Sequence, residues 1–233
     1  MSLKETAVNE LRSFYRTYPT IKFAKGEVVF HQNEAPSCVY AIKNGVIKVS
    51  NISAEGDDQL ISFEIIDDIV PICWAFSKTT KALFYYQAYT DCELYIMSKD
   101  AFESHSAENV GFANAMLSRQ VGSYIGNMLQ VDALEKTRAY TKLIYTFRYL
   151  CLRYGRDIKK DLVKIYVPLT QQEIANTTGL TRETTTLELK KLKEEKVISV
   201  RQKYYTVNTA KLDARIDDEY DPGITVNMLT KVD

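Results

Sequence analysis

The stretch that decides the fold is residues 170–196, TQQEIANTTGLTRETTTLELKKLKEEK. The tetrapeptide TQQE at 170–173 has the capping-box form, in which a threonine and a glutamate satisfy the free N–H groups that open a helix, so a helix is predicted to begin there. Gly179 favours the left-handed turn that ends this helix, and Thr181 is predicted to cap a second one. Two short helices joined by a glycine turn are typical of a helix-turn-helix, and residues 197–207, VISVRQKYYTV, predict a two-stranded hairpin, the wing of a winged helix.

The second helix carries an unusual run of threonines at 181 and 184–186. Threonine is a mediocre helix former, because its branched side chain loses rotamer freedom against the preceding turn. These hydroxyls therefore either face a partner with hydrogen-bonding groups, or are exposed and idle or bonded back to their own helix. We expect Leu187, Leu189 and Leu192 to face inward. Candidates for the outer face are Arg182, Glu183, Thr185, Thr186, Lys190 and Lys193.

Charge is distributed unevenly along the chain. The formal net charge of the 233 residues is zero, but residues 137–211 hold 16 Lys and Arg against 7 Asp and Glu, and the remainder holds 14 against 23. A basic region that coincides with a helix-turn-helix favours a polyanionic partner, and we expect double-stranded DNA. The acidic tail, residues 212–233, either packs on the roll, contacts RNA polymerase or stays disordered.

Residues 21–97 have the alternating pattern of β-strands. Short runs rich in Val, Ile, Tyr and Phe, such as VVF and ELYIMS, are separated by turn signals at 24–26 (AKG), 44–45 (NG) and 55–57 (EGD). The Asn-Gly pair at 44–45 is the strongest hairpin signal, because both residue types tolerate positive φ. Several strands at this spacing predict a closed roll or barrel.

A helical period begins near Glu108 and continues for almost thirty residues, on the order of 40 Å. Two apolar stripes need two partners, and we expect one to pack on the roll and the other on the same helix of a second subunit, giving a homodimer. The alternative is a long helix buried within one chain. The first stripe, the expected dimer interface, has the spacing of a coiled-coil seam and consists of Leu117, Val121, Tyr124, Met128 and Val131. The second consists of Phe112, Met116, Ile125 and Leu129.

The predicted fold class is therefore α+β, with an N-terminal β-roll, a long dimerisation helix and a C-terminal winged helix-turn-helix. A further helix is predicted over about Thr137 to Tyr154, with Gly155 as its C-terminal cap. The predicted boundaries are 1–107 for the roll, 108–136 for the dimerisation helix, 137–211 for the winged helix-turn-helix and 212–233 for the tail.

The sequence offers little for catalysis or metal binding. Four scattered cysteines, among them Cys73 and Cys92, form no C-x-x-C pair, so no zinc or iron–sulfur site is expected, and buried thiols are favoured over a redox role. His31 and His105 alone cannot supply a metal cluster, so neither an enzyme nor a cofactor is expected. The chain has no apolar run long enough to span a membrane and no signal peptide at the start, which predicts a cytoplasmic protein without a membrane partner.

The order of these elements resembles that of the cyclic-AMP receptor protein and fumarate–nitrate regulator (CRP/FNR) family of bacterial transcription factors, over about residues 20–210. The motifs that carry the resemblance are KGEVVF and VYAIKNGVIKV in the roll and QQEIA, TGLTRETTT and LKKLKEEKVI in the helix-turn-helix. The resemblance implies that the roll is a jelly roll like those that bind cyclic nucleotides, and that the protein regulates transcription as a homodimer.

The resemblance also implies which residues contact DNA. Arg182 and Glu183 lie where the family reads base edges, since a guanidinium matches the two acceptors of guanine and a carboxylate accepts from the amino group of cytosine. Thr185 or Thr186 is expected to bond a base edge or to touch a thymine methyl. Thr170, Gln171 and Thr181 are expected to bind phosphates. The complete set of predicted DNA contacts is Thr170, Gln171, Gln172, Thr181, Arg182, Glu183, Thr185, Thr186, Lys190 and Lys203.

One departure from the family pattern lies in the second helix. Thr186 and Leu187 occupy the positions where the family commonly has a second arginine and a small residue. We therefore expect an inverted repeat that is related to the family's common site but differs from it.

The nucleotide site of the roll departs more strongly. Where nucleotide-binding members have a glycine and glutamate, followed by an arginine–serine pair, this chain has Pro71 and Ile72, then Ala82 and Leu83. Burying a phosphate without its counter-charge is costly, so we expect no binding of cyclic AMP or cyclic GMP. The alternative is that Lys78 or Lys81 replaces the missing arginine. The aromatic residues of this stretch form either a filled core or a pocket for another effector. The candidate pocket residues are Cys73, Trp74, Phe84, Tyr86 and Tyr124.

Two functions remain in view. The first is a homodimeric DNA-binding regulator that does not sense cyclic nucleotides, with RNA polymerase as an expected partner. The second is a regulator whose DNA binding is switched by a non-nucleotide small molecule in the roll.

Overall fold

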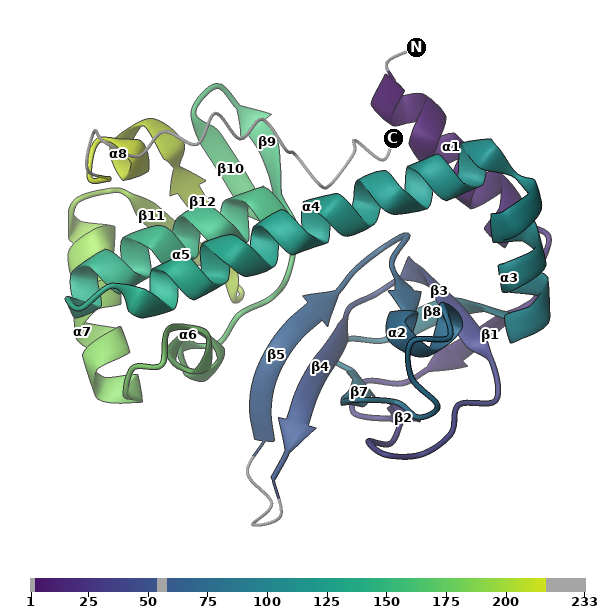
Figure 1. Cartoon of the computed structure of the whole chain (residues 1–233). Coiled ribbons are helices and arrows are strands. Elements are labelled where there is room, and N and C mark those ends of the chain that lie inside the picture. The colour runs from purple at the N-terminus through teal and green to yellow at the C-terminus, as the bar shows by residue number, and fades with distance from the viewer. Residues whose placement is uncertain (1–2, 54–57, 217–233) are drawn as a thin grey trace. The chain divides into compact units, whose positions relative to one another are not determined.

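The computed structural model describes residues 3–53 and 58–216 of the chain. The chain divides into two compact units, Met1–Ser118 and Arg119–Asp233. The α+β class, the β-roll and the winged helix-turn-helix predicted from the sequence are all present, and the elements are labelled in Figure 1.

The first unit is a β-roll of two antiparallel sheets, with strand orders β1-β8-β3-β6 and β2-β7-β4-β5. A cluster of buried side chains, including Tyr40, Ile42, Ile47, Val49 and Leu94, draws on strands of both sheets and fills the roll. The elements are α1 (Leu3–Tyr15), β1 (Thr20–Phe23), β2 (Val28–Phe30), β3 (Val39–Asn44), β4 (Ile47–Ile52), β5 (Asp58–Glu64), β6 (Ile69–Val70), α2 (Ile72–Ala75), β7 (Tyr85–Ala88), β8 (Cys92–Met97) and α3 (Lys99–Glu108).

The hairpin predicted at Asn44-Gly45 is wrong. Strand β3 pairs with β6 and β8, whereas β4 pairs with β5 and β7, so this turn carries the chain from one sheet to the other. Gly45 has φ +96°, and a Cβ there would lie 2.6 Å from the Asp91 carbonyl oxygen and from Cys92 Sγ. The glycine thus serves a close approach between segments distant in sequence. Strands β4 and β5 do form a hairpin, with Ile52 opposite Asp58, but its predicted turn at 55–57 falls outside the described residues.

The long helix α4 runs from Val110 to Glu135, 26 residues or about 39 Å. It begins two residues later than predicted, because α3 ends at Glu108 and Asn109 separates the two helices. The Asn109 carboxamide oxygen accepts a hydrogen bond from the Phe112 amide at 2.8 Å, which caps α4. The short helix α3 was not predicted.

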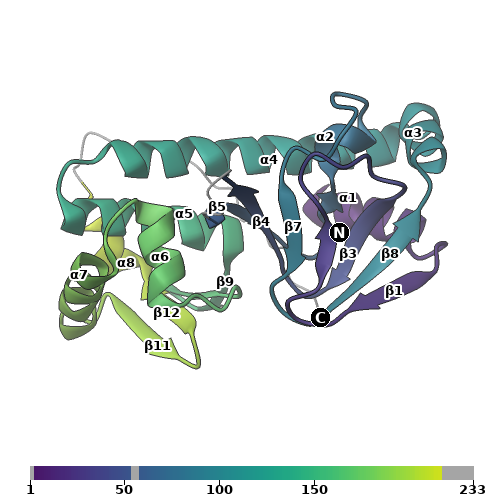
Figure 2. The ribbon, with the colours of Figure 1, turned by 90° about the horizontal axis from the view of Figure 1, so that it is seen from below.

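The second unit contains the rest of α4 and the winged helix-turn-helix. Its four strands form one antiparallel sheet in the order β11-β12-β10-β9, and its buried face packs on α5, where the Phe147 and Tyr205 rings lie 5.5 Å apart. Figure 2 shows the β11–β12 hairpin and the helices α6 and α7 of this unit. Its elements are α5 (Ala139–Tyr154), β9 (Gly155–Lys159), β10 (Leu162–Ile165), α6 (Gln171–Thr178), α7 (Arg182–Glu194), β11 (Ile198–Arg201), β12 (Tyr204–Asn208) and α8 (Thr209–Asp213).

Two details of this unit differ from the sequence prediction. Gly155 follows α5 as predicted, but with φ −92° and ψ 153° it is extended rather than left-handed. A Cβ at Gly155 would lie 2.3 Å from the Cys151 carbonyl oxygen, so close packing explains the glycine. The chain also continues into α8 across the predicted boundary at residue 211, and only residues 217–233 of the predicted tail lie outside the described part.

Candidate nucleic-acid interface

The first helix of the motif, α6, begins with the predicted capping box. The Thr170 hydroxyl accepts a hydrogen bond from the Glu173 amide at 3.2 Å, and the Glu173 carboxylate accepts one from the Thr170 amide at 2.6 Å. The backbone amides of Gln171 and Gln172, the first residues of α6, take no part in this capping box. They remain at the helix N-terminus, which is suited to an anion such as a phosphate. Gln172 is exposed and its amide group donates to Asn176 at 2.8 Å.

The turn between the helices depends on Gly179. Its φ of +64° and ψ of 25° are left-handed, and the Leu180 amide returns to the Ala175 carbonyl at 3.2 Å. A Cβ at Gly179 would meet only the Leu134 side chain, at 3.6 Å. The glycine is therefore required by backbone conformation and not by lack of space.

The second helix, α7, presents unpaired charges at its start. The Thr181 hydroxyl accepts a hydrogen bond from the Thr184 amide at 3.2 Å, which caps the helix as predicted. Arg182 and Glu183 follow in the first turn and are exposed. Within the part of the chain that the structure describes, neither side chain has an ion-pair or hydrogen-bond partner, so both are available to a ligand. Lys190, two turns further along, is also exposed.

The threonine run divides between the two faces of α7. Thr185 has no exposed surface, so the prediction that it faces DNA is wrong. The prediction that Leu187 faces inward is wrong as well, because 63% of its surface is exposed. The reason is geometric: Thr185, Leu189 and Leu192 are spaced by four and three residues and share one face of the helix, whereas Leu187 lies almost opposite.

Thr186 stays on the outer face, but its hydroxyl is already engaged. It lies 2.9 Å from the Gln171 side-chain oxygen and 2.8 Å from the Arg182 carbonyl, so its single hydrogen is shared between α6 and its own helix. The bond back to the helix is the alternative that sequence reasoning left open. The methyl group of Thr186 and the two lone pairs of its hydroxyl oxygen remain for a base.

The wing is held next to the start of α6. Strands β11 and β12 pair antiparallel, with Arg201 opposite Tyr204, and the turn residues Gln202 and Lys203 have φ of +50° and +69°. The Leu169 amide donates to the Lys203 carbonyl at 2.9 Å. This bond brings the exposed Lys203 close to Thr170 in the backbone, although the two are far apart in sequence.

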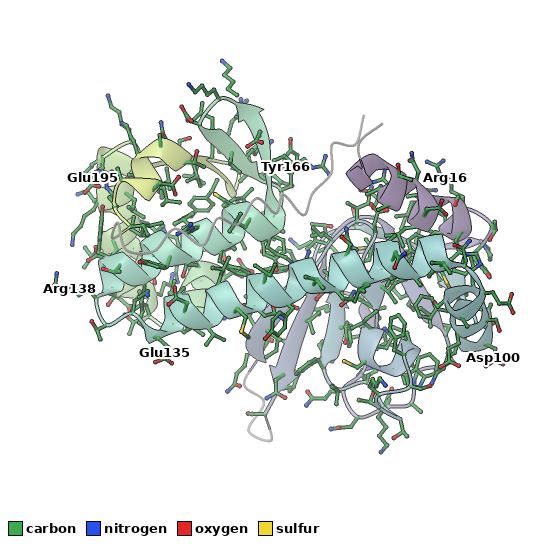
Figure 3. All side chains as sticks on the ribbon, turned by 45° about the horizontal axis from the view of Figure 1, so that its top comes forward. Arg16, Asp100, Glu135, Arg138, Tyr166 and Glu195 are labelled. Carbon is green, nitrogen blue, oxygen red and sulfur yellow. The ribbon has the colours of Figure 1, made fainter. Side chains whose placement is uncertain are left out.

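A polar network that the sequence did not predict supports the C-terminal end of α7. The Tyr140 hydroxyl donates to the Glu195 carboxylate at 2.6 Å, and the Arg215 guanidinium donates to the same carboxylate at 2.8 Å. The hydrogen bond from Tyr140, followed by that from Arg215, lowers the pKa of Glu195. Figure 3 labels Glu195 at this end of the helix. No local sequence pattern indicates this network, because its members lie up to 75 residues apart.

In the roll, the acidic residues at the start of the altered cassette bind protein groups. Arg12 of α1 donates hydrogen bonds to both carboxylate oxygens of Asp67, at 2.9 and 2.8 Å. These bonds are the main cause of the raised pKa of Arg12. The Asp68 carboxylate accepts from the Ile65 amide at 2.8 Å. Where the family has its arginine–serine pair, Ala82 is buried and Leu83 is exposed.

The candidate effector residues are not brought into one cluster. Trp74 packs beside the core that includes Ala75 and Met116, whereas Phe84 and Tyr86 belong to the core inside the roll. Tyr124 lies in the second unit, with 62% of its surface exposed. Burial raises the pKa of the thiols of Cys73, Cys92 and Cys151. These thiols are therefore poor nucleophiles. A cavity of about 410 Å³ lies elsewhere in the roll and is lined by Asn33 and residues 77–83.

Helix α4 has the two stripes expected of it. Phe112, Met116 and Leu129 are buried and Ile125 is partly buried. The seam stripe is exposed along its whole length, and its members Leu117, Val121, Tyr124, Met128 and Val131 keep between 47% and 62% of their surface accessible. Exposed apolar stripes of this length mark contact surfaces in proteins.

Neither a metal cluster nor a membrane span is found in what the structure describes. No three His, Cys, Asp or Glu side chains there gather in a way that could hold a metal ion. No described helix combines the length and the apolar character needed to cross a bilayer.

Comparisons with known proteins bear on both units. Residues 143–215 match the family model of the Crp-like helix-turn-helix domain, and residues 20–109 match that of the cyclic nucleotide-binding domain. The chain is 23% identical over 187 residues to the global nitrogen regulator of Synechococcus elongatus, covering 80% of this chain and 84% of the relative. It is 26% identical over 188 residues to the fumarate and nitrate reduction regulatory protein of Yersinia pestis, covering 78% and 72%.

Solved structures agree with this fold. FixK2 from Bradyrhizobium japonicum matches with a TM-score of 0.69 at 15% identity, over 84% of this chain and 96% of the other. CprK complexed with OCPA matches with a TM-score of 0.62 at 19% identity, over 87% and 92%.

Proposed function

Because the chain belongs to the CRP/FNR family and is a DNA-binding transcription regulator, we propose that it acts as a homodimer on an inverted repeat and does so without cyclic AMP or cyclic GMP. The observation that carries the proposal is the pair Arg182 and Glu183, exposed and unpaired at the capped start of α7 among the described residues. An arginine and a glutamate in this position can read guanine and cytosine in the major groove.

The remaining contacts would position the duplex. Thr170, Gln171 and Thr181 stand at the two helix N-termini, where backbone amides suit phosphate oxygens. The hydroxyl groups of Thr170 and Thr181 already donate to Glu173 and Thr184. Lys203 of the wing and Lys190 of α7 add exposed positive charge. Thr186 would contribute its methyl group and the lone pairs of its hydroxyl oxygen, and Gln172 its exposed amide. Thr185 has no role in this interface.

The dimer is supported by the exposed seam stripe of α4. Its members lie three and four residues apart, which is the spacing of a two-stranded coiled coil. Two-fold symmetry of the protein would be matched by two-fold symmetry of the DNA site, with half-sites about 34 Å apart.

RNA polymerase is the further partner that we propose, since a regulator acts by changing how polymerase uses the promoter. Both partners belong to the cytoplasm of a bacterial cell.

Loss of cyclic-nucleotide binding is supported by the altered cassette. The positions of the family's phosphate-binding pair hold Ala82 and Leu83, which offer neither charge nor side-chain hydrogen-bond donors. Arg12 is engaged by Asp67 and is therefore not free to replace the missing arginine. Lys78 and Lys81 line a pocket with Ala82 and Leu83, but an ammonium group cannot make the bidentate contact to phosphate that a guanidinium makes.

A selection experiment tests this proposal. Purified, dialysed protein is incubated with random duplexes at two salt concentrations, and the bound fraction is sequenced. We expect a two-fold-symmetric motif and an affinity that falls steeply with salt, as several phosphate contacts require. Equal binding of all sequences would contradict base readout. Calorimetry with cyclic AMP and cyclic GMP should show no heat of binding, and a stoichiometric signal would contradict the loss of the nucleotide site.

A second candidate is a regulator switched by a non-nucleotide effector. It is favoured by the retained roll and its cavity of about 410 Å³, a volume within the range of small-molecule pockets. A ligand must bind one state more tightly than the other to shift DNA affinity. The expected sign is recovery of motif binding only after a small-molecule fraction of cell extract is added. Full motif binding by stripped protein, unchanged by the extract, would exclude this candidate.

A further inference from the structure

The outer face of the four-stranded sheet in the second unit is basic and aromatic. Alternate residues of the strands point to opposite faces. Val163, Ile165, Tyr205 and Val207 are buried on the face that packs on α5. Lys164, Tyr166 and Tyr204, which adjoin these residues in sequence, therefore line the opposite face. Strand pairing adds Arg156, opposite Lys164, and Arg201, opposite Tyr204. We call this surface the basic sheet face and define it as Arg156, Lys164, Tyr166, Arg201 and Tyr204.

Strand register places these residues side by side. Arg156 of β9 lies directly opposite Lys164 of β10, and Lys164 lies opposite Thr206 of β12. Two residues along β12, Tyr204 lies opposite Arg201 of β11. Three cations from three strands thus share one face with two tyrosines, and none of the paired residues on this face is acidic.

Two cations of this face, Arg156 and Lys164, contact aromatic rings. The Arg156 guanidinium lies 4.8 Å from the centre of the Tyr166 ring. The Lys164 ammonium lies 5.1 Å from the Tyr166 ring and 5.2 Å from the Tyr204 ring. The Nε atom of Arg156 is buried and has no hydrogen-bond partner in the described part of the chain. Tyr166, labelled in Figure 3, remains 39% exposed.

Like charges directly opposite each other on two strands repel, and Arg156 and Lys164 are such a pair. Cation–π contacts with Tyr166 and Tyr204 offset this repulsion. An anion bound to the face would relieve the repulsion further and supply acceptors to the guanidinium and ammonium groups.

The basic sheet face is continuous with the proposed DNA contacts. Arg201 and Tyr204 flank the wing turn, and the Lys203 carbonyl in that turn is bonded to Leu169, immediately before Thr170. A duplex whose phosphates meet Thr170 and Lys203 therefore passes the edge of this face.

We propose that the basic sheet face binds the phosphate backbone of the same duplex, outside the bases read by α7. The proposal rests on the proposed function and extends it, because it assigns a second, sequence-independent contact to DNA flanking the inverted repeat. The chemistry fits: guanidinium and ammonium groups bind phosphate oxygens, and tyrosine hydroxyls are frequent phosphate donors.

The test compares two duplexes that contain the selected motif. The core duplex ends at the motif, and the long duplex adds about ten base pairs, one helical turn, of random sequence on each side. The triple variant R156Q/K164Q/R201Q is compared with wild type and with a charge-matched control, R16Q/K22Q/K25Q, whose exposed cations lie in the first unit. Each protein is titrated at several salt concentrations, and its unfolding midpoint is measured.

For wild type and the control, the long duplex should bind more tightly than the core duplex. The triple variant should bind the core duplex like wild type, lose roughly tenfold in affinity for the long duplex, and show a salt slope lower by about 0.9 for each phosphate contact removed. The single variant R201Q, at an exposed position, should lower the salt slope by about 0.9, the value for one phosphate contact. It keeps the test decisive if the triple variant unfolds.

Three outcomes would overturn the inference. In the first, wild type binds the core duplex but binds the long duplex no more tightly, or the variants keep the wild-type affinity and salt slope on the long duplex. Either result would overturn the inference and leave the proposed function standing. An equal loss on both duplexes would place these residues within the core contact instead. Wild type that binds neither duplex above random DNA would overturn the proposed function and this inference together.

Discussion

Single residues decide which groups of α7 are available to DNA. Arg182 and Glu183 are exposed in the first turn, whereas Thr185, three positions later, is completely buried. The hydroxyl of Thr185 has no hydrogen-bond partner among the described residues. A buried hydroxyl without a partner is destabilising, so this threonine is explained neither by DNA nor by the fold.

Thr185→Val should stabilise the protein. Valine has nearly the same shape and the same β-branch, and it removes the unsatisfied hydroxyl, so the free energy of unfolding should rise by about 1 kcal/mol. Urea unfolding measures this, and DNA affinity should not change. Thr186→Val, on the exposed face, is the matched control and should break the bond to Gln171 without this gain. Lost DNA binding by Thr185→Val at unchanged stability would contradict the buried position.

Arg182→Ala should relax base specificity at one position of each half-site. Losing a bidentate contact to guanine should cost about 1–3 kcal/mol against the preferred base and little against others. The comparison is Lys203→Ala, which should weaken all sequences alike and lower the salt slope by about 1. Affinities for the motif and for single-base variants of it measure both effects. A uniform loss for Arg182→Ala would show that this arginine contacts only phosphate.

Turns and helix ends illustrate the same physics at the scale of elements. Gly26 and Gly45 both have positive φ, +92° and +96°, but their surroundings differ. A Cβ at Gly26 meets nothing within 4 Å, whereas one at Gly45 would collide with the backbone of Asp91 and Cys92. The first glycine serves conformation only, and the second also serves the crossing between the two sheets.

Gly45→Ala should therefore destabilise the roll more than Gly26→Ala. The backbone strain common to both is about 1–2 kcal/mol. Gly45→Ala adds overlap with backbone atoms that cannot rotate away, and the total should exceed that of the control by about 1–3 kcal/mol. Thermal or urea unfolding of the two variants gives the difference. Equal losses would mean that the chain at Asp91 yields easily.

The Glu195 network should make a small, pH-dependent contribution at the end of α7. The pKa of the Glu195 carboxyl is lowered in the folded protein. The stabilisation by this carboxylate is therefore fully present above its ordinary pKa of 4.5 and is lost as the pH falls through the lower folded-state pKa. Glu195→Gln should reduce stability at pH 7 by less than about 1 kcal/mol, because the site is partly exposed, and the difference from wild type should vanish in acid. Glu194→Gln, next to it, is the control. A constant difference at all pH values would contradict an ionic contribution.

At the scale of the whole molecule, the seam stripe of α4 predicts the oligomeric state. Met128→Glu should give monomers at concentrations where wild type is dimeric, because a carboxylate would be buried in the interface. Asn127→Glu adds the same charge next to the stripe and should stay dimeric. Sedimentation velocity distinguishes the two, and DNA affinity should fall with the dimer. A dimeric Met128→Glu would show that the stripe is not the interface.

Local chemistry explains what could be predicted from the sequence. The capping box at Thr170, the left-handed Gly179 and the cap at Thr181 each depend on contacts within three or four residues, and all three were predicted correctly. The strands of the roll and the wing hairpin follow from alternation and turn residues in the same way. Conversely, Asn44-Gly45 was misread because its dihedral preference is local, whereas the sheet that each flanking strand joins is not.

The sequence by itself therefore determined the order and type of the main elements, the helix-turn-helix and the basic charge of its region, because these depend on neighbouring residues. Only the tertiary structure decided which face of α7 is buried, which sheet each strand beside Gly45 joins and how β9, β10, β11 and β12 align their cations. Those features arise from packing and strand register between segments far apart in the chain, which no short stretch of sequence records.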